Sequence, residues 1–346
     1  MHSAPQTKLS TRDRFLPAWI ILAMAAGLGI GKAIPNLNNK IDAIQIQGTS
    51  LPIALGLFMM MYPVLAKVRY SEMSQLRSDR KLLVTSLILN WLIGPALMFS
   101  LAWIFLADEP NFRTGLIVIG LARCIAMVLI WNELACGSRE AAALLVAVNS
   151  IFQVIAYALL GTFYLNVLPG WLGLEKFDIA FSTSAITQSV LIFLGAPLIA
   201  GYLTRRFAVK QKGENWYEDK FLPKIGPWAL YGLLFTIVLM FALQGEQITS
   251  SPGVVLKIAV PLLIYFFIMW GVSYLFGKKV GMPYEKATTL AFTAAGNNFE
   301  LAIAVSIGVW GITSGQALVG VIGPLIEVPA LVSLVYVSLW LRKRYK

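Results

Sequence analysis

The sequence has few charged residues, and this scarcity limits the kind of protein that it encodes. Only 13% of its 346 residues are Asp, Glu, Lys or Arg, whereas an ordinary soluble domain carries about 25%. Apolar residues make up 58% of the chain, and the mean hydropathy is +0.73. These values exclude a disordered protein and a soluble enzyme of ordinary composition.

Cysteine and histidine are also scarce. Cys124 and Cys136 are too few for a disulfide framework, and the single His2 excludes a metal site built on histidines. We expect no bridge between the two cysteines, because a helix would separate them by about 18 Å. The sequence contains no Walker A loop, nucleophile–base pair or metal-binding cluster, so it predicts a protein that is not an enzyme, with no cofactor.

The charge that is present is mostly positive, with 28 Lys and Arg against 17 Asp and Glu. In so apolar a chain, basic loops at an anionic membrane surface explain this excess better than nucleic-acid binding does. The sequence therefore predicts contact with a lipid bilayer and none with nucleic acid.

Long apolar runs are abundant. A transmembrane helix needs about 20 mostly apolar residues. This criterion predicts ten spans with short connections, near 16–35, 51–68, 82–107, 114–135, 140–168, 185–204, 224–243, 254–277, 287–308 and 315–341. We expect an all-α, multi-pass protein of the plasma (inner) membrane.

Lysine and arginine are distributed unevenly between alternate connections. If the N-terminus is cytoplasmic, 22 of them lie in cytoplasmic segments and 3 in outer loops. Since positive residues concentrate in the cytoplasmic loops of multi-pass proteins, both termini are predicted to be cytoplasmic. They comprise an N-terminal segment, 1–15, and a basic tail, 342–346.

The two halves of the chain align when one is shifted by 174 residues, which places Cys124 on Asn298. Each half holds five spans, and because five is odd, the second half enters the membrane from the opposite side. The sequence therefore predicts two inverted five-helix repeats, 16–168 and 185–341, joined by an outer linker, 169–184. The alternative is a chance alignment of apolar sequences.

Spans four and nine carry turn signals in the middle of apolar segments. The Gly-Asn-Asn triplet at 296–298 interrupts span nine, and a weaker signal, Gly120 with the pair Arg123-Cys124, lies in span four. Irregular backbone survives inside a membrane only where it is buried in protein or lines a cavity. Breaks at corresponding positions of two repeats indicate a transporter site. We expect both helices to unwind and to cross at one point.

Three residues beside these signals are unusual inside a membrane. Glu300 is a proton carrier if its carboxyl titrates, or a neutral group hydrogen-bonded between helices. Cys124 is a soft ligand if the neighbouring Arg123 favours its thiolate, or a small packing residue. Arg123 needs an anion or backbone carbonyls, so it pairs with Glu300 or Glu327, or binds an anionic substrate.

Polar residues on spans five and ten are expected to support this site. Glu327 lies in a proline-flanked stretch, where freed carbonyls accept a cation or a hydrogen bond. Asn149 and Gln153 lie on one face of span five, and the 174-residue shift places Gln153 on Glu327. The alternative role for Asn149 and Gln153 is hydrogen bonding between helices.

Three stretches of the chain carry a family resemblance: Gly-Leu-Ala-Arg-Cys-Ile-Ala-Met at 120–127, Asn-Asn-Phe-Glu-Leu at 297–301 and Gly-Pro-Leu-Ile-Glu-Val-Pro at 323–329. They resemble the ten-span arsenical-resistance (arsenite efflux) permeases of the bile acid/arsenite/riboflavin transporter superfamily. The resemblance implies export of arsenite, and of antimonite, by proton exchange without an obligatory ATPase. It implies a core domain of spans 3–5 and 8–10 and a panel of spans 1–2 and 6–7.

The resemblance also implies that Cys124 and Glu300 are essential. The chain departs from the family at Gly296, where a small hydroxyl residue is usual, and at Ser138, where an acidic residue is usual. The first departure bears on hydrogen bonding at the crossing, and the second lies in a loop. The predicted substrate-binding residues are Cys124, Arg123, Asn297, Asn298 and Glu300, and Glu300 also couples transport to protons. The predicted supporting residues are Asn149, Gln153, Glu327 and Gly296.

The sequence thus predicts a proton-coupled arsenite exporter that confers arsenical resistance. One alternative is a sodium-coupled importer of an organic anion on the same fold, with Glu327 and Gln153 at sodium and Arg123 at the anion. Another is a solute-sensing receptor without net transport, although no soluble signalling domain is predicted.

Overall fold

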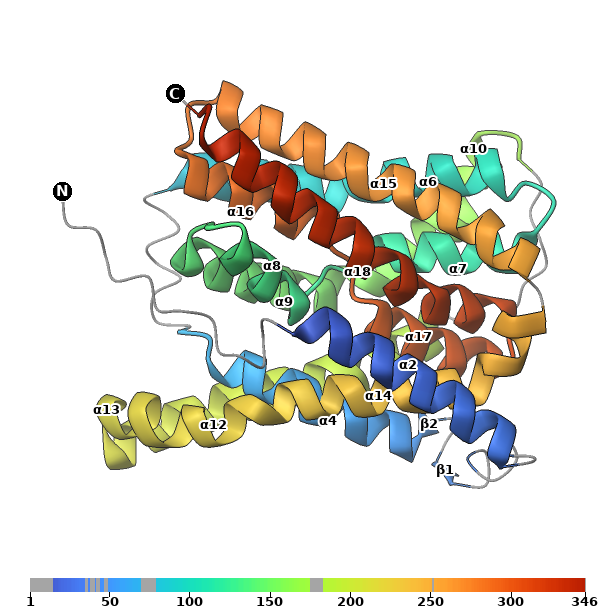
Figure 1. The fold of residues 1–346 in the computed structure, drawn as a ribbon, viewed down its shortest axis with the longest axis horizontal. Helices are drawn as coiled ribbons and strands as arrows, with labels where there is room; N and C mark the ends of the chain where they lie inside the picture. Colours follow the sequence, from blue (N-terminus) through green and yellow to red (C-terminus); the bar gives the residue numbers. More distant parts are fainter. Residues whose placement is uncertain are drawn as a thin grey trace.

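Helices make up most of the described chain in the computed structural model (Figure 1). The structure describes residues 15–34, 37, 41, 44–46, 49–69, 79–174, 183–250 and 252–345. The predicted N-terminal segment, except Phe15, lies outside the described residues. So do residues 175–182 of the predicted linker and Lys346 of the basic tail.

Helices lie over all ten predicted segments. Five segments are single helices: α2 (Leu16–Ala33), α4 (Leu51–Ala66), α14 (Leu222–Ser250), α15 (Pro252–Lys279) and α18 (Gly315–Arg342). Three are composite, built from α5 (Arg80–Ile88) and α6 (Gly94–Phe105), α9 (Arg139–Thr162) and α10 (Leu168–Trp171), and α11 (Thr183–Val190) and α12 (Ala196–Lys212). Two are interrupted and are made of α7 (Pro110–Leu121) with α8 (Met127–Leu134), and α16 (Tyr284–Ala295) with α17 (Phe299–Trp310).

Six continuous helical stretches of the described chain are long and apolar enough to cross a membrane, and α4 and α17 are shorter apolar helices. Many large apolar side chains on these helices are exposed, among them Ile104, Leu159 and Leu275. Such side chains are unfavourable in water and favourable against lipid tails. The chain is therefore a polytopic helical membrane protein.

In the described part of the chain, four short π-helical segments occur inside or beside the helices, and the second residue after each of them is a proline. They are η2 (Leu89–Ile93), η3 (Phe163–Val167), η4 (Leu191–Gly195) and η5 (Tyr217–Phe221), with α13 (Glu214–Trp216) just before the last. The prolines are Pro95, Pro169, Pro197 and Pro223. Proline lacks an N–H and its ring clashes with the carbonyl four residues earlier, so the helix accommodates the ring by widening locally.

A hairpin of two strands, each two residues long, precedes α4. Strand β1 (Gln45–Ile46) pairs antiparallel with β2 (Thr49–Ser50), with Ile46 opposite Thr49. The expectation of an all-helical chain missed this hairpin, which is too short to give an alternating apolar pattern.

The helices form two layers (Figure 1). We call the first the α14 layer, in which α14 packs along α2 and α4, and α12 along α4. We call the second the crossover layer, which contains α5–α9 and α15–α18. Helix α18 is the most enclosed of the six long stretches, because α7, α15 and α17 all pack on it.

An ion pair ties two helices of the crossover layer together at their starts. Asp79 caps α5 by accepting from the backbone N–H of Leu82 at 3.2 Å, and it accepts from Lys286 Nζ, on α16, at 2.5 Å. Partial burial raises the pKa of Asp79, but the hydrogen bond and charge of Lys286 outweigh this effect, so the pKa lies below its usual value. The carboxylate therefore stays ionised at neutral pH and keeps the pair intact.

Gly232 allows α14 and α4 to approach closely, and we expect its replacement by alanine to destabilise the α14 layer. A β-carbon at Gly232 would lie 2.5 Å from the backbone nitrogen of Met60 and 2.8 Å from the carbonyl oxygen of Gly56. Backbone atoms cannot move aside independently, so overpacking is expected to cost about 1–3 kcal/mol. Thermal unfolding of Gly232→Ala in detergent measures this loss.

The matched control is Gly271→Ala on α15, where a β-carbon would meet nothing within 4 Å. Because alanine favours helix over glycine, this variant should melt at the parent temperature or above it. Equal melting of Gly232→Ala and the parent would contradict the close approach.

Candidate functional site

The two interrupted helices cross at their breaks. Helix α7 ends at Leu121 and α8 begins at Met127, while α16 ends at Ala295 and α17 begins at Phe299. Between these ends, Arg123 and Asn297 form an antiparallel bridge. The N–H of Cys124 donates to the carbonyl of Gly296 at 3.3 Å, and the N–H of Asn298 donates to the carbonyl of Ala122 at 3.0 Å. The predicted breaks therefore meet, and each satisfies backbone groups of the other.

Side chains from α9 and α18 complete the backbone hydrogen bonding at this crossover. Gln153 Oε1 accepts from the N–H of Arg123, and Glu327 Oε1 accepts from the N–H of Asn297 at 3.2 Å. Donors and acceptors of the two bonds are each 174 residues apart in the sequence. The break at Arg123 is thus hydrogen-bonded by a neutral amide, and the break at Asn297 by an ionisable carboxyl.

Arg123 is fully buried, and backbone carbonyls rather than carboxylates accept the hydrogen bonds of its guanidinium. It donates to the carbonyl of Gly120, to the carbonyl of Ala294 at 3.3 Å and to the hydroxyl of Tyr265 at 2.8 Å. Among the described residues, no carboxylate forms an ion pair with it. Pairing of Arg123 with Glu300 or Glu327 is therefore wrong, because the helix ends at the two breaks already supply acceptors.

Cys124 is buried beside carboxyl groups. Side chains of consecutive extended residues point to opposite sides, which directs Cys124 away from the guanidinium of Arg123. The carboxyl of Glu327 lies close to Cys124 across Gly296. Stabilisation of a thiolate by Arg123 stays a prediction.

Gly296 separates Cys124 from Glu327. A β-carbon at this position would lie 3.1 Å from Cys124 Cβ and 3.6 Å from Glu327 Oε1. A side chain at this position would press against the β-carbon of Cys124. Gly296 therefore leaves space between Cys124 and the carboxyl of Glu327.

Glu300 lies in the first turn of α17, directly at the crossover, and is buried. Asn298 caps this helix, since its Oδ1 accepts from the N–H of Leu301 at 3.0 Å. The positive end of the α17 dipole favours negative charge at Glu300, whereas its burial disfavours charge.

Several buried polar atoms around the crossover have no hydrogen-bond partner among the described residues. They include three amide nitrogens, one amide oxygen and one guanidinium nitrogen: Asn149 Nδ2, Gln153 Nε2, Asn298 Nδ2, Asn297 Oδ1 and Arg123 Nε. The other polar atom of each amide group is already hydrogen-bonded. For instance, Asn149 Oδ1 accepts from Trp91 Nε1 at 3.1 Å, and Asn297 Nδ2 donates to the carbonyl of Ile119 at 2.7 Å. The site therefore offers mainly donors to an oxygen-bearing guest.

Two aromatic residues of this network were not predicted. The hydroxyl of Tyr265 accepts a hydrogen bond from the guanidinium of Arg123, and Trp91 Nε1 donates one to the amide oxygen of Asn149. The sequence interpretation placed most tyrosines and tryptophans at the membrane interface. The position of Tyr265 could have indicated its role, because it lies in the middle of its predicted span and not near an end.

No group of three or more His, Cys, Asp or Glu residues in the described chain is arranged to hold a metal ion. Cys124 and Cys136 are free thiols. The chemistry available at the crossover is therefore that of one thiol, two carboxyls and a set of amides.

Helices that break at mid-length and meet around buried carboxyls are a feature of secondary transporters. The fold and the site define a protein of this class, a multi-pass membrane transporter. Residues 54–251, more than half of the chain, match the Sodium Bile acid symporter family. The chain belongs to this family and, within it, to the arsenical-resistance permeases.

Three relatives match nearly the whole chain, and the two arsenical-resistance proteins among them support this assignment. The arsenical-resistance protein Acr3 of Corynebacterium glutamicum is 57% identical over 338 residues, which cover 98% of this chain and 91% of that protein. Acr3 of Alkaliphilus metalliredigens is 31% identical over 336 residues, or 94% of this chain and 92% of its own. An uncharacterised transporter of Synechocystis sp. is 35% identical, with 94% and 88% covered. The family resemblance is confirmed, and with it the prediction of a transporter and not an enzyme.

Proposed function

We propose that this chain exports arsenite, and antimonite as a second substrate, from the cytoplasm in exchange for protons. The observation that carries the proposal is the meeting of Cys124, Glu300 and Glu327 at the crossover. The relatives named for arsenical resistance, which the chain matches almost from end to end, support the same substrate.

The chemistry of the site suits arsenite. At neutral pH arsenite is mostly the uncharged trihydroxide, whose hydroxyls accept hydrogen bonds and whose arsenic prefers sulfur. The amides of Asn149, Gln153 and Asn298 supply unpaired donors, and Cys124 supplies one soft ligand. A single thiol holds such a centre reversibly, whereas three would trap it, and a carrier must release its cargo.

Proton exchange requires one group that alternates between protonation states as the site changes sides. We assign this role to Glu300, which lies at the start of α17 beside the crossover. No ATPase partner enters the proposal, since the proton gradient supplies the free energy.

We further propose ten spans in two inverted repeats, with both termini cytoplasmic in the plasma membrane. Supporting this, the bounds of α7 and α16 differ by 174 residues at each end. The backbone bonds at the crossover follow the same offset, because Cys124 with Gly296 and Asn298 with Ala122 exchange roles under it. The crossover layer would then correspond to the core domain and the α14 layer to the panel.

A second candidate function is sodium-coupled import of an organic anion. The description of the matched family as sodium bile acid symporters favours it. The burial of Arg123 against carbonyls and Tyr265 disfavours it, because the guanidinium is already engaged by protein atoms.

Flux in proteoliposomes separates the two functions. The purified protein is reconstituted, and pH and sodium gradients are imposed separately while arsenite movement is measured. We expect arsenite flux that follows the pH gradient and ignores sodium. Arsenite flux that is indifferent to pH would refute proton exchange, and sodium-dependent uptake of an organic anion without arsenite flux would favour the second function.

A further inference from the structure

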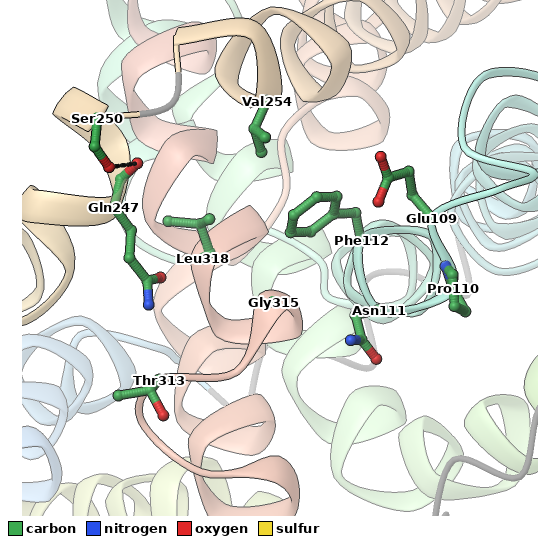
Figure 2. Close-up of a pocket in the computed structure, with 10 residues that line it drawn as sticks. All are labelled: Glu109, Pro110, Asn111, Phe112, Gln247, Ser250, Val254, Thr313, Gly315 and Leu318. Atoms are coloured by element: carbon green, nitrogen blue, oxygen red, sulfur yellow. Dashed lines mark hydrogen bonds between the residues drawn. The ribbon is translucent and has the colours of Figure 1, made fainter.

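A cavity of about 360 Å³ lies between the two layers, at the starts of α7 and α18 (Figure 2). Figure 2 shows Gln247 and Ser250 of α14 on one side, Asn111 and Phe112 of α7 on the other, and Leu318 of α18 between them. Both α7 and α18 run from this cavity to the crossover. Nine residues of α18 separate Leu318 from Glu327, a rise of about 14 Å, so the cavity is distinct from the site described above.

Gln244 lies near Gln247, one of the residues that line this cavity. It precedes Gln247 by about one helical turn on α14, on the side nearer the middle of the bundle. Its Nε2 donates to the carbonyl of Ile312 at 2.6 Å, and the side chain is almost fully buried. Ile312 lies in the turn between α17 and α18, next to Thr313, which lines the cavity.

This hydrogen bond crosses from the α14 layer to the crossover layer. Most bonds described between distant side chains join helices of one layer, such as Tyr62 with Thr204 and Lys286 with Asp79. The bond between Gln244 and Ile312 is uncharged, so it is readily exchanged for bonds to water.

We propose that Gln244 is the outer gate of the transport pathway. In this proposal, the bond to Ile312 holds the two layers together beside the cavity, and breaking it lets the layers part and opens the cavity toward the crossover. The proposal rests on the proposed function, because it takes relative movement of the two layers as the transport step. The Oε1 of Gln244, which has no partner among the described residues, and the freed Nε2 would then face a hydroxylated solute on its way out.

The experiment measures access to a residue one turn deeper than the gate. Met240 lies four residues before Gln244, on the same face of α14, and is buried. Met240→Cys is made in a Cys136→Ser background that keeps Cys124, and intact cells are treated with a membrane-impermeant maleimide. The background without Met240→Cys corrects for any reaction at Cys124.

Gln244→Leu keeps the size of the side chain and removes the hydrogen bond. We expect the labelling rate at position 240 to rise about three- to tenfold, the population shift that loss of one neutral hydrogen bond produces. Gln244→Asn, whose amide is too short to reach Ile312, should act in the same direction and serves if the leucine variant folds poorly. Gln188→Leu, the same change at an exposed position of α11, should leave the rate unchanged.

Unchanged labelling in both Gln244 variants would overturn the gate, and so would an equal rise in Gln188→Leu. A rise found only in inside-out vesicles would place the contact on the cytoplasmic side and also overturn it. The labelling needs neither arsenite nor a pH gradient. A failure of arsenite export with an intact labelling response would therefore count against the proposed function and leave the gate standing.

Discussion

Replacing Glu300 by glutamine is expected to abolish proton-driven arsenite export. Glutamine keeps the shape of the side chain, and the cap from Asn298 to Leu301 does not involve it, so α17 should form as before. The variant loses only the ability to take up and release a proton. Exchange of one proton for one neutral arsenite moves one charge, which is worth about 2.3 kcal/mol per 100 mV, or a concentration ratio of about 50. In Glu300→Gln this ratio should fall to one.

Everted vesicles with an imposed membrane potential of about 100 mV, positive inside, and labelled arsenite measure this ratio directly. Glu285→Gln is the matched control, since Glu285 lies in the first turn of α16 as Glu300 does in that of α17, but on the surface. It should accumulate arsenite like the parent. Gradient-driven accumulation in Glu300→Gln at the parent level would assign the proton to another group, and Glu327 would be the next to test.

Replacing Cys124 by alanine is expected to reduce arsenite tolerance of a sensitive host to that of cells without the transporter. The change removes one sulfur atom from a buried position, and the backbone bond from Cys124 N–H to Gly296 remains available. The crossover should therefore persist while its soft ligand is lost. Growth on graded arsenite, with membrane protein levels measured in parallel, tests the prediction.

Cys136→Ala provides the control for this prediction. Cys136 is the second free thiol and is partly exposed in the turn that follows α8. Its loss should leave tolerance at the parent level. Parent-like tolerance in Cys124→Ala would show that the sulfur is dispensable and would leave the amides and carboxyls as the binding groups.

The sequence predicted the helical segments and both interruptions because these follow from local composition. Twenty apolar residues form a membrane helix in many surroundings, and a Gly-Asn-Asn triplet inside such a run favours a turn over a continuous helix. The π-helical segments were missed although proline positions such as Pro95 and Pro197 carried a signal. Proline inside a long apolar run indicates a local change of helix geometry without revealing which change occurs.

The side-chain partners at the crossover were harder to predict. Arg123 was expected to need an anion or backbone carbonyls, but the sequence could not say which, because the carbonyls of Gly120 and Ala294 become acceptors only when two helix ends meet there. These ends lie far apart in the sequence, so local pattern cannot place them together. The roles of Cys124 and Glu300 stay predictions that the experiments above test.

The pairing of the two breaks through backbone atoms has a consequence for how such proteins diversify. The bonds between Cys124 and Gly296 and between Asn298 and Ala122 use only main-chain groups, which every residue except proline can supply. Mutation can therefore exchange the side chain at 124 without breaking these bonds, whereas Gly296 leaves little room for a β-carbon and the side chain of Asn298 also caps α17. Over evolutionary time, cargo preference can drift at this junction while the surrounding bundle is inherited unchanged.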